Sequence, residues 1–321
     1  MTQPRISVIM SVYNTEPEYL QEAVSSILNQ TFRDFEFLIV DDGSNVETKK
    51  NLAVFTDPRI RILVNDMNLG LTKSLNRALK ECRGDYIARM DSDDFSFPQR
   101  FASQLEYMKS HPEYSVIGSR FTITDKKGTY PVHWTDDPEV KRVHFLFYND
   151  GICHPTAFFQ RSFLLGHGIT YREEVRKAQD YAMWLSIIDS GGRLGLCPEV
   201  LLIYRVHPGQ ITSNISDQMQ CEQMTIRLQL DRFSKDFSEE DRQLFYHFYR
   251  GEITENEEQL LLFLKQLIII NQEKHIYNDN LLLSEIKKIW RLAALKQIKK
   301  CHRFVLLKMQ NKLNILSISD R

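Results

Sequence analysis

The first 94 residues alternate between short apolar runs and segments with helical spacing, and this alternation limits the fold more than any other feature of the chain. The four apolar runs stand at 6–10, 35–40, 60–64 and 86–90. Helical patterns between them run from about 18 to 29 and from 71 to 81, and a polar helix follows residue 44. Strands that alternate with helices form parallel sheets with helices on both faces. The sequence therefore predicts an α/β fold with a mainly parallel sheet.

Acidic or aromatic side chains follow three of these runs. They are Tyr13 after the first run, Asp41 and Asp42 after the second, and Asp91, Asp93 and Asp94 after the fourth. In an open α/β sheet, ligands bind outside the carboxyl ends of the strands. We therefore expect these side chains to meet in one site at that edge.

Several common kinds of site are excluded. No GxGxxG follows the first run and no GxxxxGK[ST] occurs, so a dinucleotide turn and a P-loop are missing. Lys and Arg number 41 against 42 Asp and Glu, for a formal net charge of −1. Nucleic-acid binding usually requires an excess of Lys and Arg. We therefore expect no nucleic-acid partner.

Asp91, Asp93 and Asp94 stand within four residues of one another. Carboxylates this close repel one another at pH 7 unless a cation or hydrogen bonds compensate. A hard divalent cation binds one or two carboxylates together with phosphate oxygens, and it stabilises the charge that develops on a departing diphosphate. The alternatives are that these acids cap the following turn and that Asp41 and Asp42 only form an Asx-type turn.

Five blocks of sequence resemble the glycosyltransferase family 2 domain, which has the GT-A fold. In order, they cover 6–14, 25–32, 35–44, 68–76 and 84–94. The resemblance extends from residue 5 to about 210. It implies a Rossmann-like, mixed but mainly parallel sheet flanked by helices, in a catalytic domain over 1–213. Residues 1–94 would form the nucleotide-binding half of that domain, and 95–213 the acceptor half.

The same resemblance implies that a UDP-sugar lies over the first strand ends. Tyr13 would stack on the base, and Asp42, with Asp41 beside it, would bind the base or ribose. Ser11 would line the same pocket. Lys73 matches a position from which a basic residue reaches the base or the phosphates, and its alternative is a solvated helix charge.

The run from Asp91 through Ser92 to Asp93 matches the family's DxD motif. The resemblance implies that it holds Mn²⁺ or Mg²⁺ against the diphosphate, with Asp94 next in line. We expect Asp93 to be the direct metal ligand.

Asp180 stands at the start of a predicted helix, at a position where many family members have a catalytic Asp. The resemblance implies that it is the general base, which removes the proton of the acceptor hydroxyl as that oxygen attacks the anomeric carbon. A single displacement of this kind inverts the stereochemistry. Gln179 replaces the Glu that often precedes this Asp, which puts a role of that Glu in acceptor binding in doubt. The alternative is an acid favoured by the helix dipole.

The segment 204–212 resembles the family's closing motif, Tyr-Arg-x-His followed by Ser or Thr. In related enzymes this stretch orders over the nucleotide sugar, so His207 is predicted to approach the diphosphate or the metal. His154 is a weaker candidate for a contact near the donor or acceptor. The alternative for each is a packed or solvated histidine.

The residues from 214 to 321 lose strand signals and predict helices at 219–233, 239–249, 255–271 and 281–315. The stretch 287–312 has nine Lys and Arg, no Asp or Glu, and interleaved apolar residues. This composition predicts a peripheral helix on an anionic membrane, and the alternative is a bundle helix or an oligomer contact. No apolar run is long enough to span a membrane and no signal-peptide pattern is present. We therefore expect a cytoplasmic location. If the tail binds the membrane, the protein would lie at its inner face. Whether the chain forms a homo-oligomer stays open.

The resemblance implies an inverting, metal-dependent glycosyltransferase that uses a UDP-sugar. A hexose or N-acetylhexosamine would pass to a sugar acceptor, such as a lipid-linked oligosaccharide in O-antigen or capsule synthesis, and glucose or galactose is the first guess. One alternative is a sugar-phosphate nucleotidyltransferase, but residues 11–14 are not the Gly-rich, Arg-containing loop expected of one. The other is an inactive glycan- or nucleotide-binding module, against which Asp91, Asp93 and Asp180 count.

Overall fold

The computed structural model describes residues 3–132, 137–148, 151–175, 178–207, 215–253 and 256–298. The chain divides into two compact units. The first holds residues 1–138 and 151–217, and the second holds residues 139–150 and 218–321.

The first unit is built on a mixed sheet, in which nine strands lie within the described residues. The strands are β1 (Ile6–Val12), β2 (Phe35–Asp41), β3 (Ile60–Val64), β4 (Tyr86–Asp91), β5 (Phe95–Ser96), β6 (Val116–Asp125), β7 (Gly128–Val132), β8 (Phe158–Gln160) and β9 (Leu194–Arg205). Their order is β3-β2-β1-β4-β8-β6-β9-β5, with β7 paired to β6. The first four strands are parallel. The predicted α/β fold with a mainly parallel sheet is confirmed.

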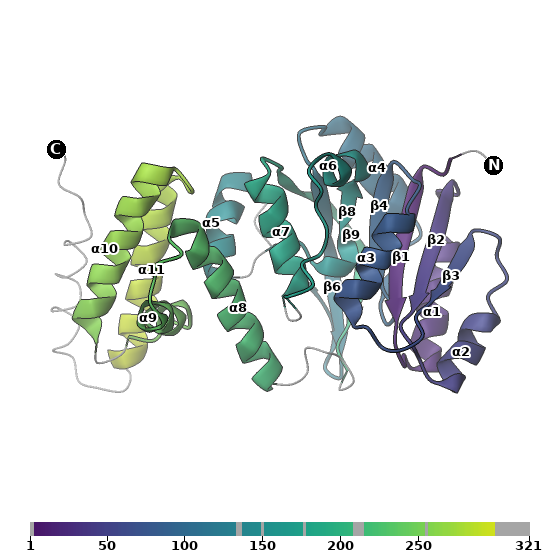
Figure 1. Ribbon diagram of the computed structural model, residues 1–321, viewed down its shortest axis with the longest axis horizontal. Helices are drawn as coiled ribbons and strands as arrows, with labels where there is room; N and C mark the ends of the chain where they lie inside the picture. Colours follow the sequence, from purple (N-terminus) through teal and green to yellow (C-terminus); the bar gives the residue numbers. More distant parts are fainter. Residues whose placement is uncertain are drawn as a thin grey trace. The chain divides into compact units, whose positions relative to one another are not determined.

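Helices cover both faces of this sheet. They are α1 (Pro17–Leu28), α2 (Val46–Ala53), α3 (Leu71–Glu81), α4 (Arg100–Ser110), α6 (Arg161–Gly166) and α7 (Gln179–Asp189), with a short 3₁₀ turn at His154–Thr156. Side chains of one face of β1, such as Val8 and Met10, join α1, α2 and α4 in one hydrophobic cluster. Helix α3 packs against β1 and β2 and lies in front of them in Figure 1. Because both faces are buried, β1 is apolar at nearly every position.

Strand pairing brings distant polar residues to one edge. Strand β1 lies between β2 and β4, with Val12 opposite Asp41 and Ser11 opposite Asp91. At the far side of the sheet, β5 pairs antiparallel with β9, and Phe95 lies opposite Ile203. The residues just before β5 and just after β9 are therefore neighbours. Both junctions place side chains at the carboxyl ends of the parallel strands.

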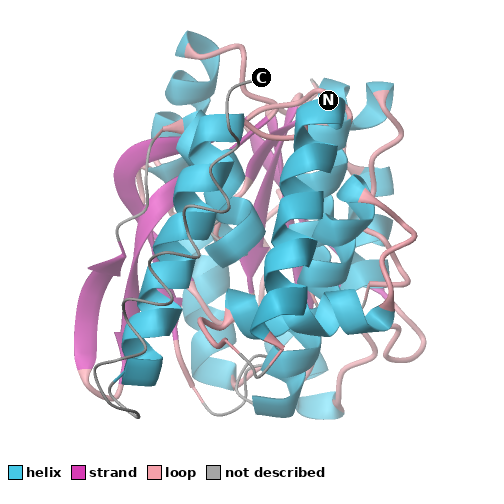
Figure 2. Cartoon of the chain, turned by 90° about the vertical axis from the view of Figure 1, so that its left-hand side faces the viewer, coloured by secondary structure: helices cyan, strands magenta, loops and turns pink. Residues whose placement is uncertain are grey.

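The second unit is helical. Its helices are α5 (Pro138–Tyr148), α8 (Ile215–Phe233), α9 (Glu239–Tyr249), α10 (Glu257–Lys274) and α11 (Asp279–Ile298). Buried residues such as Phe245, Leu264 and Trp290 form one hydrophobic cluster in this unit. Helices α10 and α11 run side by side (Figures 1 and 2).

The division between the units differs from a single boundary after residue 213. Helix α5 comes from the sequence expected to form the acceptor half, yet it groups with the C-terminal helices. Val143, Leu146 and Phe147 of α5 join the hydrophobic cluster of the helical unit, and the ring of Phe147 lies 5.9 Å from that of Phe245. The predicted boundary itself falls in residues 208–214, outside the described residues.

Helix α11 contains the first part of the stretch predicted to contact a membrane. Ile289 and Trp290 are buried in the helical cluster, whereas Leu292 and Leu295 are half exposed. The described part, up to residue 298, therefore packs as a bundle helix, which was the alternative interpretation. The rest of the basic stretch lies outside the described residues. Among the helices that the structure describes, none is both long and apolar enough to cross a bilayer.

A capping box begins α9, and it gives a test of the helical unit. The Asp241 backbone N–H donates to Ser238 Oγ over 3.1 Å, and the Ser238 N–H donates to Asp241 Oδ2 over 2.9 Å. We expect Ser238→Ala to lower the free energy of unfolding by about 1 kcal/mol, the usual effect of losing such a cap. Urea denaturation measures it. Ser284→Ala, at an exposed position within α11, is the control, and equal effects of both changes would contradict the capping role.

Candidate functional site

Three carboxylates meet after β4. Ligand oxygens of Asp91, Asp93 and Asp94 all lie within 4.8 Å of one another. Asp94 is fully buried, and its Oδ1 accepts a hydrogen bond of 3.0 Å from the Arg205 backbone N–H. Asp94 Oδ2 is also buried and has no hydrogen-bond partner within the described part of the chain. A buried carboxylate oxygen without a partner is costly and calls for a cation, a proton or a water.

The charge state of this cluster is strongly affected by burial. Burial raises the pKa of Asp91 to about 6, with further upward contributions from Asp93 and Asp180, although the guanidinium of Arg89 opposes them. Burial and the charges of Asp91 and Asp93 raise the pKa of Asp94 well above its ordinary value. A bound cation would favour the ionised form of each group.

The donor set suits a hard divalent cation. Carboxylate oxygens are the ligands that Mg²⁺ and Mn²⁺ prefer, and one or two are usually combined with substrate phosphates. Asp91 and Asp93 offer such oxygens on partly exposed side chains, and Asp94 adds a buried oxygen that has no partner among the described residues. The residues therefore fit the Mn²⁺ or Mg²⁺ expected from the sequence.

His207 lies at this cluster. Its Nε2 is 2.9 Å from Asp93 Oδ2, and its ring centroid is 5.1 Å from that of Tyr19 on α1. The pairing of β5 with β9 explains the approach, since it places the residues after Arg205 beside Asp93 and Asp94. The structure thus brings His207 to the predicted metal ligands. Residues 208–212 of the same motif lie outside the described residues.

Asp41 and Asp42 organise the neighbouring loops. Asp41 Oδ1 accepts a 2.8 Å hydrogen bond from the backbone N–H of Ser44, which is the turn considered as an alternative. Asp42 accepts from the side chain of Asn65 and from the backbone N–H groups of Leu69 and Gly70, so both of its oxygens have partners. These bonds fix the loop before α3. Contact of either carboxylate with a base or ribose stays a prediction.

Gly43 explains why these two loops can come so close. Its φ is +69°, and an added Cβ would lie 2.4 Å from the backbone carbon of Met67. Both the left-handed backbone and the lack of space require glycine.

The other predicted nucleotide contacts line the same edge. Ser11 is paired in register with Asp91, and Tyr13, which follows β1, is 50% exposed. An exposed aromatic ring at the rim of a site is available for stacking. Lys73 is exposed on the first turn of α3 and lines a cavity of about 360 Å³ with residues 68–72 and Glu173. Ser92 is held by a 2.7 Å hydrogen bond between its hydroxyl and that of Thr15.

Asp180 lies in the first turn of α7. Its Oδ1 accepts a 2.8 Å hydrogen bond from the backbone N–H of Tyr181, which agrees with the alternative of a first-turn acid favoured by the helix dipole. Burial raises the pKa of Asp180, although that hydrogen bond and the charge of Arg89 oppose the shift. Its charge in turn contributes to raising the pKa of Asp91, so the two carboxylates interact electrostatically. A raised pKa makes Asp180 a better proton acceptor near neutral pH.

His154 is packed in the interior, which was the alternative for it. It is buried, its Nε2 lies 2.8 Å from the hydroxyl of Tyr171, and its ring packs edge-on against Trp184. Burial and the charge of Arg89 lower its pKa well below the ordinary value, which favours the neutral ring. A contact with donor or acceptor stays a prediction.

Two arginines at the site were not predicted as site residues. Arg89 is buried in β4 and forms an ion pair with Asp91. Arg205 donates to the backbone carbonyl of Asp93 over 3.1 Å, forms an ion pair with Glu22 and stacks over Tyr19. Arg205 belongs to the closing motif and could have been proposed from it. For Arg89, the only signal in the sequence was that a charged residue stands between the apolar positions of β4.

Comparison with known proteins agrees with this arrangement. The family model described as Glycosyl transferase family 2 matches residues 7–168. An uncharacterized glycosyltransferase of Methanocaldococcus jannaschii is 31% identical over 211 residues, which is 64% of this chain and 72% of that protein. The O-antigen biosynthesis glycosyltransferase WbnJ of Escherichia coli is 29% identical over 237 residues, which is 69% of this chain and 87% of that protein.

Solved structures share the fold. The crystal structure of S. aureus TarS 1–349 in complex with UDP-GlcNAc superposes with a TM-score of 0.61 at 17% identity, covering 97% of this chain and 90% of that one. The chain spans about half, 54%, of a longer TarS structure. The likeness to the two TarS structures concerns the fold. The family match over 7–168 is what assigns the activity class, and the chain belongs to glycosyltransferase family 2.

Proposed function

We propose that the chain is an inverting, metal-dependent glycosyltransferase that moves a hexose or N-acetylhexosamine from a UDP-sugar to a sugar acceptor. The observation that carries this proposal is the cluster of Asp91, Asp93 and Asp94, whose ligand oxygens lie within 4.8 Å of one another. These three carboxylates suit a cation, and Asp180, whose charge acts on Asp91, suits a base.

The roles follow from position. Tyr13 stacks on the base at the exposed rim, and Lys73 reaches toward the phosphates from α3. Asp93 and Asp91, with His207 beside them, hold Mn²⁺ or Mg²⁺, which when bound neutralises charge on the diphosphate. Asp180 accepts the proton of the attacking acceptor hydroxyl. Attack on the side opposite the diphosphate inverts the anomeric centre.

We place the acceptor in surface polysaccharide synthesis, as a sugar on a lipid carrier. The support is the likeness to WbnJ, whose name assigns it to O-antigen biosynthesis. The TarS complex holds UDP-GlcNAc, which supports a UDP-sugar as donor. Glucose and galactose remain the first sugars to test. Family membership argues against a sugar-phosphate nucleotidyltransferase, so an inactive binding module is the alternative to test.

The proposal predicts metal-linked donor binding. A panel of UDP-, GDP- and dTDP-sugars is titrated against the protein in a thermal-shift assay, with Mn²⁺ or with EDTA. Ligand that binds only the native state raises the unfolding midpoint. We expect a shift with a UDP-sugar, and an affinity at least about tenfold weaker in EDTA and in Asp93→Ala, since each would remove the cation that Asp93 would hold to neutralise the diphosphate.

Glu106→Ala is the matched control, because Glu106 is an exposed carboxylate on α4 outside the site. It should bind the donor like the parent. No shift with any nucleotide sugar would overturn the donor site. A thermal shift that survives both EDTA and Asp93→Ala would support the donor site but contradict the proposal that donor binding needs a metal. Donor binding without any turnover would favour the inactive module.

A further inference from the structure

An arginine-lined cavity lies at the opposite edge of the sheet from the candidate site. Its volume is about 620 Å³, and its charged lining residues are Arg33, Asp34, Glu36, Arg59, Arg61, Arg83 and Arg161. Five arginines thus face two carboxylates. Nothing in the proposed transfer reaction uses these residues.

The topology explains why the arginines gather there. Arg33 and Arg59 stand just before β2 and β3, and Arg83 lies before β4. Arg161 follows β8, which runs antiparallel to β4, so the end of β8 lies beside the beginning of β4. The cavity is therefore at the amino ends of the parallel strands. β1 has seven residues, so at about 3.3 Å per residue this edge is about 20 Å from the carboxyl ends.

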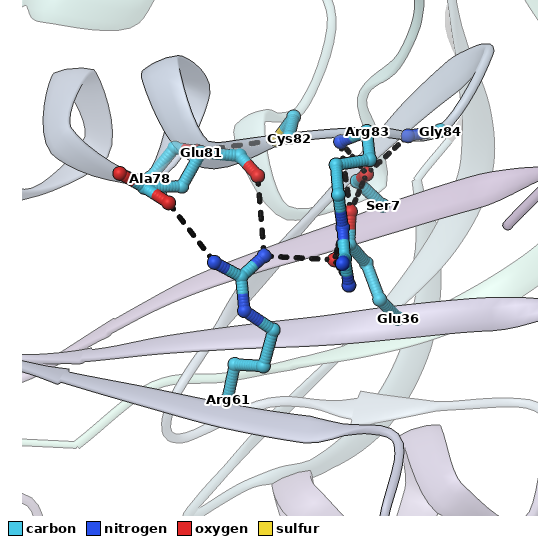
Figure 3. Close-up of polar contacts among 8 residues, drawn as sticks. All are labelled: Ser7, Glu36, Arg61, Ala78, Glu81, Cys82, Arg83 and Gly84. Atoms are coloured by element: carbon cyan, nitrogen blue, oxygen red, sulfur yellow. Dashed lines mark hydrogen bonds and ion pairs between the residues drawn. The ribbon is translucent and has the colours of Figure 1, made fainter. Parts of the chain in front are cut away.

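Three of the five arginines form ion pairs with carboxylate side chains. Arg59 binds both carboxylate oxygens of Asp57. Figure 3 shows Arg61 and Arg83 converging on the carboxylate of Glu36, with Arg61 also bonded to Glu81 at the end of α3. These pairs build a rigid wall on one side of the cavity.

The remaining two arginines differ. Arg33 donates to the backbone carbonyl of Leu28 over 2.9 Å and, like Arg161, has no ion pair within the described part of the chain. The Nε of Arg161 is buried and has no hydrogen-bond acceptor among the described residues. A buried, charged N–H donor without an acceptor is costly. An anion in the cavity would balance the charge of the Arg33 and Arg161 guanidinium groups, which both line it.

We propose that this cavity binds a phosphate-bearing ligand through Arg33 and Arg161. Guanidinium groups bind phosphate oxygens in pairs, and the fixed arginines on the wall add positive potential. The phosphate belongs either to a free phosphorylated compound or to the headgroup of an anionic lipid. The site is separate from the donor site and does not depend on the proposed transfer reaction.

The test uses the double variant Arg33→Gln/Arg161→Gln. These two side chains were chosen because removing Arg61 or Arg83 would also break the contacts of Glu36. Binding of inorganic pyrophosphate is measured by titration calorimetry in low salt and in the presence of EDTA. The EDTA weakens a metal-dependent contact of pyrophosphate at the donor site. Co-sedimentation with phosphatidylcholine vesicles containing phosphatidylglycerol tests the lipid source. Arg227→Ala, at an exposed arginine of the helical unit, is the control.

We expect the parent and Arg227→Ala to bind one of the two probes equally, and the double variant to bind it at least about tenfold more weakly, since charge-assisted hydrogen bonds are lost. Pyrophosphate binding would indicate a free phosphorylated ligand, and vesicle binding alone would indicate a lipid headgroup. Binding of neither probe, or equal binding by the double variant, would overturn the site. The single variant Arg33→Gln, at an exposed side chain, gives a second reading if the double variant does not fold.

Discussion

Asp180→Asn is expected to reduce the rate of sugar transfer by a factor of about 100 to 10,000, the usual contribution of a positioned general base. Asparagine keeps the size of the side chain and the carbonyl oxygen that accepts from the Tyr181 N–H, but it cannot take up the acceptor proton. Folding and donor affinity should therefore be retained. The rate is measured as release of UDP from the UDP-sugar that gives the largest thermal shift, with and without glycan acceptors.

Asp189→Asn provides the control for this change. Asp189 is an exposed carboxylate at the other end of the same helix, so its amide variant should turn over like the parent. Because burial raises the pKa of Asp180, the parent rate should fall as the pH drops through that raised pKa and the base becomes protonated. Turnover of Asp180→Asn at the parent rate would leave only the role of a first-turn acid favoured by the helix dipole for this residue.

The fold could be predicted best in the regular alternation of strands and helices over the first 94 residues. β3 and α3 have the predicted bounds, because apolar runs and helical spacing are strong signals there. Prediction was weaker in the acceptor half. The sequence pattern at 114–118 and 120–124 indicates two short strands, but the chain forms the single strand β6. Its register against β9 shifts on either side of Arg120, and this irregularity disturbs the alternation that sequence patterns detect.

The entry to β8 follows the local signal. Residues 153–159 indicate a strand entered from a tight turn, and the structure has a 3₁₀ turn at His154–Thr156 followed by β8 from Phe158. Pro155 has no N–H to give to a strand ladder, which favours the turn. His154 Nε2 then lies 2.8 Å from the Tyr171 hydroxyl.

Candidate site residues could be found from the sequence, but their partners could not. The acids after β2 and β4 stand at strand ends, and the pattern predicts their common edge. Whether a carboxylate is free for a ligand depends on contacts from distant segments. The carboxylate of Asp42 accepts hydrogen bonds from the backbone N–H groups of Leu69 and Gly70, and Asp91 forms an ion pair with Arg89. Only the pairing of β5 with β9 brings His207 to Asp93.

Glu36 forms the centre of a buried polar cluster that stabilises the first unit. It is 4% exposed and lies on β2 beside Ser7 of β1. Its Oε1 accepts from Ser7 Oγ over 2.7 Å, and its Oε2 accepts from Arg83 Nε over 2.9 Å and from Arg61 over 3.0 Å (Figure 3). Burial alone would raise the pKa of Glu36, but the bonds from Arg83, Ser7 and Arg61 outweigh it and hold the pKa below the ordinary value.

Glu36→Gln should therefore lower the free energy of unfolding by about 1.5–3 kcal/mol at pH 7, the range for hydrogen bonds to charged groups. The effect stays below that of a fully buried pair because Arg61 and Arg83 are partly exposed. A lowered folded pKa stabilises the native state above the ordinary value of 4.5, and that contribution is lost as the pH falls through the folded pKa. Urea unfolding at several pH values should thus show the gap in unfolding free energy between parent and variant closing in acid.

The control is Asp85→Asn, which removes an exposed ion pair with Arg5 and should change the free energy of unfolding by less than about 1 kcal/mol. A gap that is independent of pH would mean that Glu36 contributes through packing and not through its charge.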